Sequence, residues 1–152
     1  MALNSAFVGK TYSSADSYVV GREKIREFAM AIGDFNPAYH DVAAARALGH
    51  PDLVAPPTCA FVMAYRAMAQ VVGDPELGMD YSRVVHGEES FAYQRPICAG
   101  DELVVESQIE GTRIAGKNEL IDLRQELRTL DGETVAVTRA VIVSRGTAAQ
   151  EG

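Results

Sequence analysis

The chain has 152 residues, of which 47% are hydrophobic and 23% charged, and its formal net charge at pH 7 is −7. This length predicts one domain over residues 1–152, with a core of its own and a frayed tail at about 146–152. The acidic balance disfavours nucleic acid as a partner, because nucleic-acid binding rewards a basic face. No run approaches the ~20 apolar residues of a membrane span, and the start lacks a signal-peptide pattern, so we expect a cytoplasmic protein.

Short helical patterns occupy the first part of the chain. Residues 17–20 favour a short strand. Apolar residues at helical offsets predict a helix over 22–32, followed by Gly33 where a left-handed C-terminal cap is expected. Asp41 is a good N-cap for a second helix over 42–48.

Between these two helices, residues 33–41 concentrate polar side chains. The Asn36-Pro37 pair breaks a helix, because proline has no N–H and restricts the residue before it. Asp34 and His40 are therefore expected on a loop held at both ends, which is the usual place of catalytic or binding groups. A purely structural interpretation stays open, in which the segment only ends one helix, turns the chain and caps the next helix.

The most apolar stretch follows a proline-rich loop over 50–57. Residues 58–72 are apolar at almost every position, which predicts a central helix buried on most sides. Pro57 suits its first turn, where a missing N–H costs nothing. Cys59 is most simply a small core residue, and neither Cys59 nor Cys98 stands at metal-ligand spacing from a histidine, so we predict no metal site.

The second half of the chain reads as a meander of about four strands. Residues 81–96 predict one bent strand or two short ones, and residues 102–113 predict a half-buried strand. Residues 120–130 fit either a helix or a strand. The Asp-Gly pair at 131–132 is a strong hairpin signal and favours the strand, which would pair with the β-branched residues 134–143.

Such a sheet must bury one face, and the helix predicted over 58–72 is its obvious cover. An antiparallel sheet wrapped around one long apolar helix is the hot-dog fold, an α+β architecture. Hot-dog sheets commonly dimerise edge to edge across a two-fold axis, which would also protect the exposed edge strand.

Several motifs resemble one family. The run Gly-Asp-Phe-Asn-Pro at 33–37, with a histidine close behind, resembles the MaoC-like (R)-specific enoyl-thioester hydratases and dehydratases. Residues 54–58 and 86–96, with Ala-Gly-Asp at 99–101, look more narrowly like the N-terminal MaoC dehydratase (FAS1-type) group. That group includes actinobacterial single-domain proteins related to the partner subunits of the mycobacterial (R)-3-hydroxyacyl-ACP dehydratases. The resemblance covers about residues 5–145.

The resemblance implies addition or loss of water at an enoyl thioester carried on CoA or on ACP phosphopantetheine, with no cofactor. Asp34 and His40 would hold the water, and an N–H of Thr58 or Cys59 would stabilise the thioester oxygen at the start of the central helix. It also implies a homodimer, or a heterodimer with a related hot-dog subunit.

Two positions depart from the family pattern. Active members have a histidine five residues after the aspartate, but this chain has Tyr39 there and His40 one residue later. Either residue could occupy the family's histidine position. The family's His-Gly pair before the central helix is replaced by prolines at 56–57, which donate no hydrogen bond. Asn36 and Tyr39 would shape the loop or contact the substrate.

Three functions therefore stay open. The first is an (R)-specific hydratase or dehydratase of fatty-acid metabolism, a lyase. The second is a non-catalytic acyl-chain-binding subunit of a heterodimeric dehydratase. The third, more distant one is an acyl-thioesterase, since a fold does not determine a function.

Overall fold

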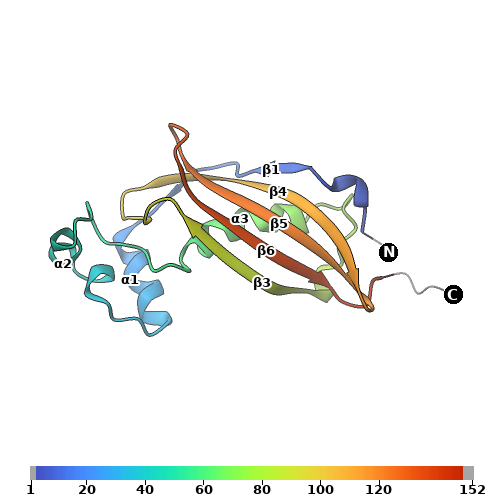
Figure 1. The fold of residues 1–152 in the computed structure, drawn as a ribbon, viewed down its shortest axis with the longest axis horizontal. Helices are drawn as coiled ribbons and strands as arrows, with labels where there is room; N and C mark the ends of the chain where they lie inside the picture. Colours follow the sequence, from blue (N-terminus) through green and yellow to red (C-terminus); the bar gives the residue numbers. More distant parts are fainter. Residues whose placement is uncertain (1–2, 149–152) are drawn as a thin grey trace.

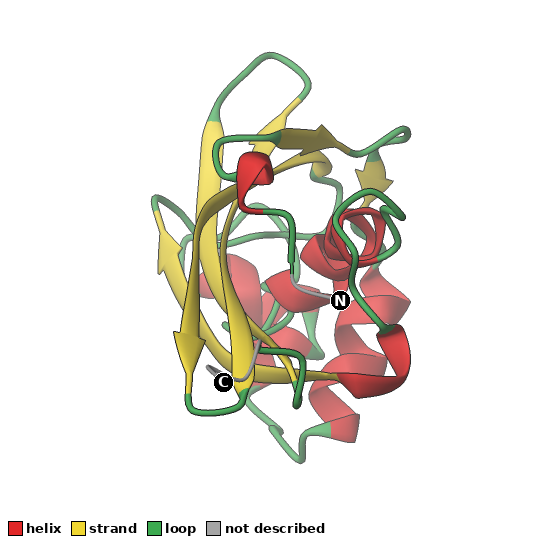
Figure 2. Cartoon of the chain, turned by 90° about the vertical axis from the view of Figure 1, so that its right-hand side faces the viewer, coloured by secondary structure: helices red, strands yellow, loops and turns green. Residues whose placement is uncertain are grey.

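The computed structural model describes residues 3–148 as one antiparallel sheet with its helices on one side (Figures 1 and 2). The helices are α1 (Arg22–Ala31), α2 (Val42–Ala47) and α3 (Ala60–Val72), with short 3₁₀ turns at Ser5–Phe7, Pro37–Tyr39 and Tyr81–Arg83. The strands are β1 (Thr11–Ser13), β2 (Tyr18–Val19), β3 (Val84–Tyr93), β4 (Glu102–Ala115), β5 (Asn118–Thr129) and β6 (Thr134–Ser144).

The six-stranded sheet has the order β1-β4-β5-β6-β3, with β2 pairing beside β1 on β4. The predicted meander is confirmed for β4, β5 and β6, but it is wrong for β3, which pairs with β6 instead of β4. The connection from β3 to β4, residues 94–101, is hydrogen-bonded to other loops. The Ala55 N–H donates to Ile97 O, and the Gly100 N–H donates to Val20 O. This crossover leaves β3 as a long strand at one edge of the sheet (Figure 1).

The ambiguous segment 120–130 is a strand, as predicted. Its buried side chains alternate, with Ile121, Leu123, Gln125 and Leu127 on the inner face. The turn that follows places Gly132 at a φ of +95°, a backbone conformation that only glycine adopts without strain. The hairpin signal therefore decided correctly between helix and strand.

Helix α3 lies across the inner face of the sheet (Figure 1). It begins at Ala60 instead of residue 58, because Pro57, Thr58 and Cys59 form a turn. Its inward side chains are buried against the sheet: Ala60, Met63, Ala64, Ala67, Met68, Val71 and Val72. Tyr65 on the opposite side is 47% exposed, so one face of the helix stays open to solvent.

One polar contact crosses this apolar core. The side-chain amide of Gln125 donates to the Ala64 carbonyl at 2.7 Å and to the Ser107 hydroxyl at 2.9 Å. These bonds satisfy the amide nitrogen, which would be costly to bury without partners, and tie the centre of β5 to the middle of α3.

The local signals at the first helices are confirmed. Gly33 has a φ of +71°, and the Asp41 carboxylate accepts from the Ala44 N–H at 2.9 Å as an N-cap. Of the frayed tail predicted at about 146–152, the structure describes residues 146–148. There the Gly146 N–H donates to the Asn118 side chain and the Ala148 N–H to the Lys117 carbonyl. Residues 149–152 lie outside the described part.

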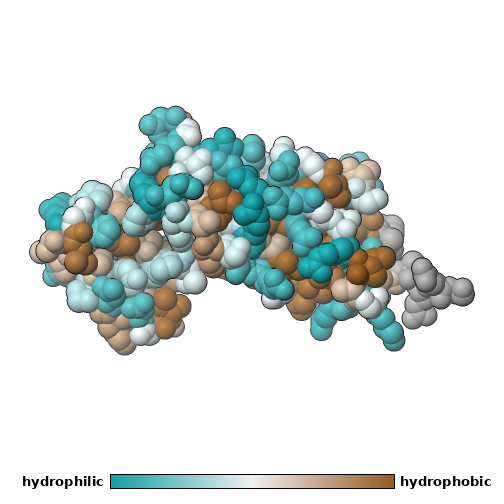
Figure 3. Space-filling view, in the orientation of Figure 1, coloured by the Kyte–Doolittle hydropathy of each residue, from teal (hydrophilic) through white to brown (hydrophobic). Residues whose placement is uncertain are grey.

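The outer face of the sheet is mostly hydrophilic (Figure 3). Ion pairs cross it from strand to strand, such as Arg128 with Glu106 at 3.1 Å and Arg139 with Glu110 at 3.3 Å. Within residues 3–148, no helix has the length and apolar character needed to cross a membrane.

Candidate functional site

The loop over residues 33–41 is held together by its own polar side chains. The Asp34 N–H donates to the Ala29 carbonyl at the end of α1, at 2.9 Å. The Asp34 carboxylate accepts from the Asn36 N–H at 3.1 Å, and the Asn36 side chain accepts from the Ala38 N–H at 3.0 Å. Each short acidic or amide side chain thus bonds the backbone two residues on, which is the Asx geometry of a tight turn.

His40 meets Asp34 at the main chain and not at the carboxylate. Its Nε2 lies 3.0 Å from the Asp34 carbonyl oxygen, which requires the tautomer with a proton on Nε2. The ring also stacks on Phe35, and the Arg26 side chain donates to the His40 carbonyl. Asp34 and His40 therefore lie next to each other, but the His40 Nε2 bonds the Asp34 main-chain carbonyl and not the carboxylate.

A cavity of about 330 Å³ opens between this loop and the start of α3. Its walls come from Tyr39, Val54, Ala55, Pro57, Tyr93, Gln94, Arg95 and Pro96, and neither Asp34 nor His40 is among them. Tyr39 is therefore the residue of this loop that lines the cavity. Burial and the nearby negative charge of Asp34 raise the pKa of the Tyr39 hydroxyl.

The start of α3 offers fewer free donors than the sequence suggested. The Cys59 N–H donates to the Pro56 carbonyl at 2.9 Å, so it is not free for a substrate oxygen as we had expected. Thr58 is exposed, and its N–H has no acceptor within residues 3–148. Burial raises the pKa of the Cys59 thiol to about 11, which keeps it protonated at neutral pH.

Tyr93 is a residue of this site that the sequence analysis missed. It stands on the inner face of β3, and its hydroxyl donates to the Pro57 carbonyl at the entrance of α3. Burial raises its pKa to about 12, although the neighbouring Ala60 N–H acts in the opposite direction. The alternation of Phe91 and Tyr93 in the sequence places both on one strand face, but only the tertiary structure brings Tyr93 to the helix start.

Arg95 lines the same cavity, and its charge is balanced by two acids. Its guanidinium donates to both oxygens of Asp101, at 2.9 and 3.0 Å, and to Glu133 at 2.8 Å. The Asp101 carboxylate also accepts from the Cys98 N–H at 2.9 Å. These acids raise the pKa of Arg95, which is committed to holding the 95–101 loop.

No group of three or more His, Cys, Asp or Glu side chains in residues 3–148 is arranged to hold a metal ion.

Comparison with known proteins places the chain in a family. Residues 6–138 match the model of the FAS1-like dehydratase domain region. The chain belongs to this family. Its sequence relatives include proteins named UPF0336 from Streptomyces avermitilis, 52% identical over the whole of both chains, and from Saccharopolyspora erythraea, 45% identical over 97% of this chain and 95% of that one.

Solved structures of dehydratases share its fold. A MaoC-like dehydratase is 34% identical with a TM-score of 0.86, and the match covers 92% of this chain and 42% of that longer one. The HadBC complex, a (3R)-hydroxyacyl-ACP dehydratase of Mycobacterium tuberculosis, is 27% identical with a TM-score of 0.83, over 90% of this chain and 96% of that one. The hot-dog fold and the resemblance to the MaoC-like dehydratases are therefore confirmed.

Proposed function

We propose that this FAS1-like dehydratase chain is a subunit of an (R)-3-hydroxyacyl-thioester dehydratase, or of the enoyl-thioester hydratase that runs the same reaction in reverse. In this proposal it binds the acyl chain, while a related hot-dog partner supplies the groups that add or remove water. The substrate would be carried on CoA or ACP phosphopantetheine. The family match and the likeness to a MaoC-like dehydratase and to the HadBC complex support this reaction class.

One observation carries the assignment of a binding role. Two of the groups that hydration chemistry would need are already bonded within the chain. The His40 ring is bonded to the main chain of Asp34, and the Cys59 N–H to the Pro56 carbonyl. A general acid or base must reach the proton that it transfers, and an oxyanion hole needs free donors. Thr58 is left as the single predicted donor without an acceptor among residues 3–148.

The chain has apolar cavities suited to an acyl chain. Besides the cavity near Tyr39, one of about 510 Å³ lies against the exposed flank of α3, where Phe61, Tyr65 and Met68 contribute to its wall. Burying each methylene of an acyl chain contributes ~0.8 kcal/mol, so an apolar wall of this kind favours longer chains over shorter ones.

A second candidate is that this chain catalyses the reaction itself. Asp34 and His40 are adjacent, because the His40 Nε2 lies 3.0 Å from the Asp34 main-chain oxygen, and both residues are only partly buried. In that case Asp34 and His40 would activate the water, and the Thr58 N–H would take the thioester oxygen.

Hydration of enoyl-CoA substrates separates the two candidates. We would assay the purified chain on crotonyl-CoA and on a longer trans-2-enoyl-CoA, alone and after co-expression with a catalytic MaoC-type subunit. We expect no hydration by the chain alone and hydration by the complex. Turnover by the chain alone that is abolished in Asp34→Asn would support the second candidate instead. Release of free CoA without a hydrated product would indicate a thioesterase.

A further inference from the structure

Two separate cavities lie along α3. The smaller one, of about 330 Å³, lies at the start of the helix, beside Pro57 and Tyr93. The larger one, of about 510 Å³, lies further along the helix, where its walls include Phe61 of α3 and His86 of β3. Among residues 3–148, the two cavities share no lining residue. The groups at the near end of the larger cavity therefore decide whether one ligand can occupy both.

Two rings meet at this near end. The Phe61 and His86 rings stack with their centroids 5.3 Å apart and their planes 12° from parallel. Along α3, Phe61 is the first residue in the wall of the larger cavity after Pro57. Along β3, His86 is nearer to Tyr93 than Val84, the other wall residue of that strand. The stack therefore stands at the end of the larger cavity that faces the smaller one.

A β-bulge at Gly87 gives His86 its neighbour. The register of β3 against β6 shifts here, and an added Cβ at Gly87 would lie 3.1 Å from a side-chain carbon of Val143. Glycine therefore lets the bulge pack closely on β6. In a regular strand, residues three positions apart point to opposite faces, but the extra residue of a bulge changes this alternation. His86 and Glu89 are accordingly in contact.

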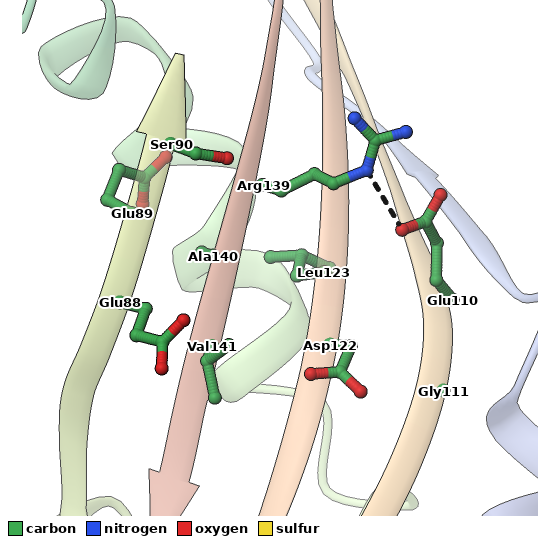
Figure 4. Close-up of a pocket in the computed structure, with 10 residues that line it drawn as sticks. All are labelled: Glu88, Glu89, Ser90, Glu110, Gly111, Asp122, Leu123, Arg139, Ala140 and Val141. Carbon is green, nitrogen blue, oxygen red and sulfur yellow. Dashed lines mark hydrogen bonds and ion pairs between the residues drawn. The ribbon is translucent and has the colours of Figure 1, made fainter.

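The Glu89 carboxylate holds the His86 ring in the stack. Figure 4 shows Glu89 on β3, beside β6. Its side chain is only 11% exposed, and the His86 Nε2 lies 2.8 Å from one of its oxygens. Burial raises the pKa of the Glu89 carboxyl, against the opposing effects of Thr138 and His86. Turning the His86 ring away would leave a buried carboxylate without this partner, which is costly, so the ring stays against Phe61.

We infer that Phe61 and His86 limit the length of the acyl chain that this subunit accepts. Their stack closes the larger cavity towards the smaller one, so an acyl chain that fills the smaller cavity ends at the two rings. This inference rests on the proposed acyl-binding function and identifies the residues that determine its specificity. Each further methylene that is buried tightens binding about fourfold, but only until the chain reaches the stack.

The dependence of affinity on chain length tests the inference. We would titrate the complex of this chain and a catalytic MaoC-type subunit with saturated acyl-CoAs, from butyryl-CoA to myristoyl-CoA, by isothermal titration calorimetry. Saturated chains have no double bond to hydrate, so the titration measures binding alone. For the wild type, we expect the affinity to rise with chain length and then to reach a plateau.

Phe61→Ala and His86→Gln should each move this plateau to longer chains. The first removes one ring of the stack, and the second removes the other ring while keeping an amide donor for Glu89. We expect both variants to bind myristoyl-CoA about tenfold or more tighter than the wild type, with butyryl-CoA unchanged. The control is Phe7→Ala, which removes a partly buried ring outside the walls of both cavities and should keep the wild-type profile. A merely structural role would weaken binding equally at all lengths.

Two results would overturn the inference. One is a plateau that stays at the wild-type chain length in either variant that is folded by circular dichroism. The other is a wild-type affinity that rises up to myristoyl-CoA without a plateau. Both leave the proposed function standing if hydration still requires the catalytic partner. Conversely, hydration by the chain alone would remove the proposed subunit role without moving the plateau, and a complex that binds no acyl-CoA of any length would remove the acyl-binding role and this inference together.

Discussion

Two polar loops flank the start of α3, and they use their charged side chains in different ways. At the 95–101 loop, Arg95 pairs with Asp101 and with Glu133 from the turn between β5 and β6, and the Asp101 carboxylate also accepts from the Cys98 N–H. In the 33–41 loop, the Asp34 carboxylate bonds one N–H, and the His40 ring bonds one carbonyl. The first loop is an ion-paired anchor, whereas the second is a turn stabilised by single neutral or charge-assisted bonds.

The difference separates acids whose hydrogen-bonding capacity is fully used within the fold from acids that can still accept further hydrogen bonds. An acid whose oxygens are occupied by a guanidinium and a backbone N–H contributes to folding and has little left for a ligand. An acid with one weak local bond costs little to remove and can still bind a ligand or a partner. The following predictions test this separation, from the largest expected effect to the smallest.

Removing Asp101 should have the largest effect. Asp101→Ala leaves Arg95 with only Glu133 and the Pro96 carbonyl, and leaves the Cys98 N–H without its acceptor, so we expect the free energy of unfolding to fall by about 2–3 kcal/mol. Urea denaturation followed by circular dichroism measures this change. Glu133→Gln is the matched control, because Glu133 is half-exposed and its pair with Arg95 should contribute less than ~1 kcal/mol. Equal losses in the two variants would contradict the anchor role of Asp101.

Lowering the pH should reveal the contribution of a second ion-paired acid, Asp52, to stability. Hydrogen bonds from Arg22 and from the Leu53 N–H lower the pKa of Asp52 to about 2. The unfolded chain then binds this proton at a higher pH than the folded chain, so stability is present above about pH 4 and is lost as the pH falls towards 2. Asp52→Asn should reduce the loss of stability across this window, measured as the urea midpoint from pH 5 to pH 2.5. An unchanged pH profile in the variant would show that Asp52 is not anchored.

The hydroxyls of Tyr93 and Tyr39, which both line the cavity, should also contribute unequally to stability. Tyr93→Phe removes the donor to the Pro57 carbonyl and should cost about 1 kcal/mol of stability. Tyr39→Phe is the control, since no partner of the Tyr39 hydroxyl is present within residues 3–148, and it should change stability by less than ~0.5 kcal/mol. Chemical denaturation compares the two. A larger loss in Tyr39→Phe would reverse our assignment of the two residues.

The smallest effect is expected at Asp34. Asp34→Asn keeps an oxygen that accepts from the Asn36 N–H, so the free energy of unfolding should change by less than ~0.5 kcal/mol. Asp41→Ala, which removes the N-cap of α2, should cost about 1 kcal/mol in the same assay. A strongly destabilised Asp34→Asn would mean that this loop is as tightly anchored as the 95–101 loop.

Local sequence patterns predicted the elements better than their connections. The alternation in 120–130 and the Asp-Gly pair identified β5, and the helical spacing in 22–32 identified α1. The pairing of β3 with β6 was missed, because strand order depends on long-range contacts that no local pattern contains. The start of α3 was placed too early, because the apolar run continues into a turn that has no helix geometry.

The candidate site was predicted only in part. The motif placed Asp34, Asn36, Tyr39 and His40 on one loop, where the structure has them. It could not tell which of Tyr39 and His40 faces the cavity, because neighbouring side chains point in different directions around the 3₁₀ turn that contains Tyr39 and ends at His40. The roles of Tyr93 and of the Cys59 N–H depend on groups brought together by the fold.

The rate of hydration by the assembled complex tests the central claim most directly. With the catalytic partner present, we would compare kcat/KM for a trans-2-enoyl-CoA between wild type and an Asp34→Asn/His40→Gln variant of this chain. A binding subunit predicts equal values, because the water chemistry comes from the partner. A fall of about 10²-fold or more, in a complex that still assembles, would contradict it and assign catalysis to this loop.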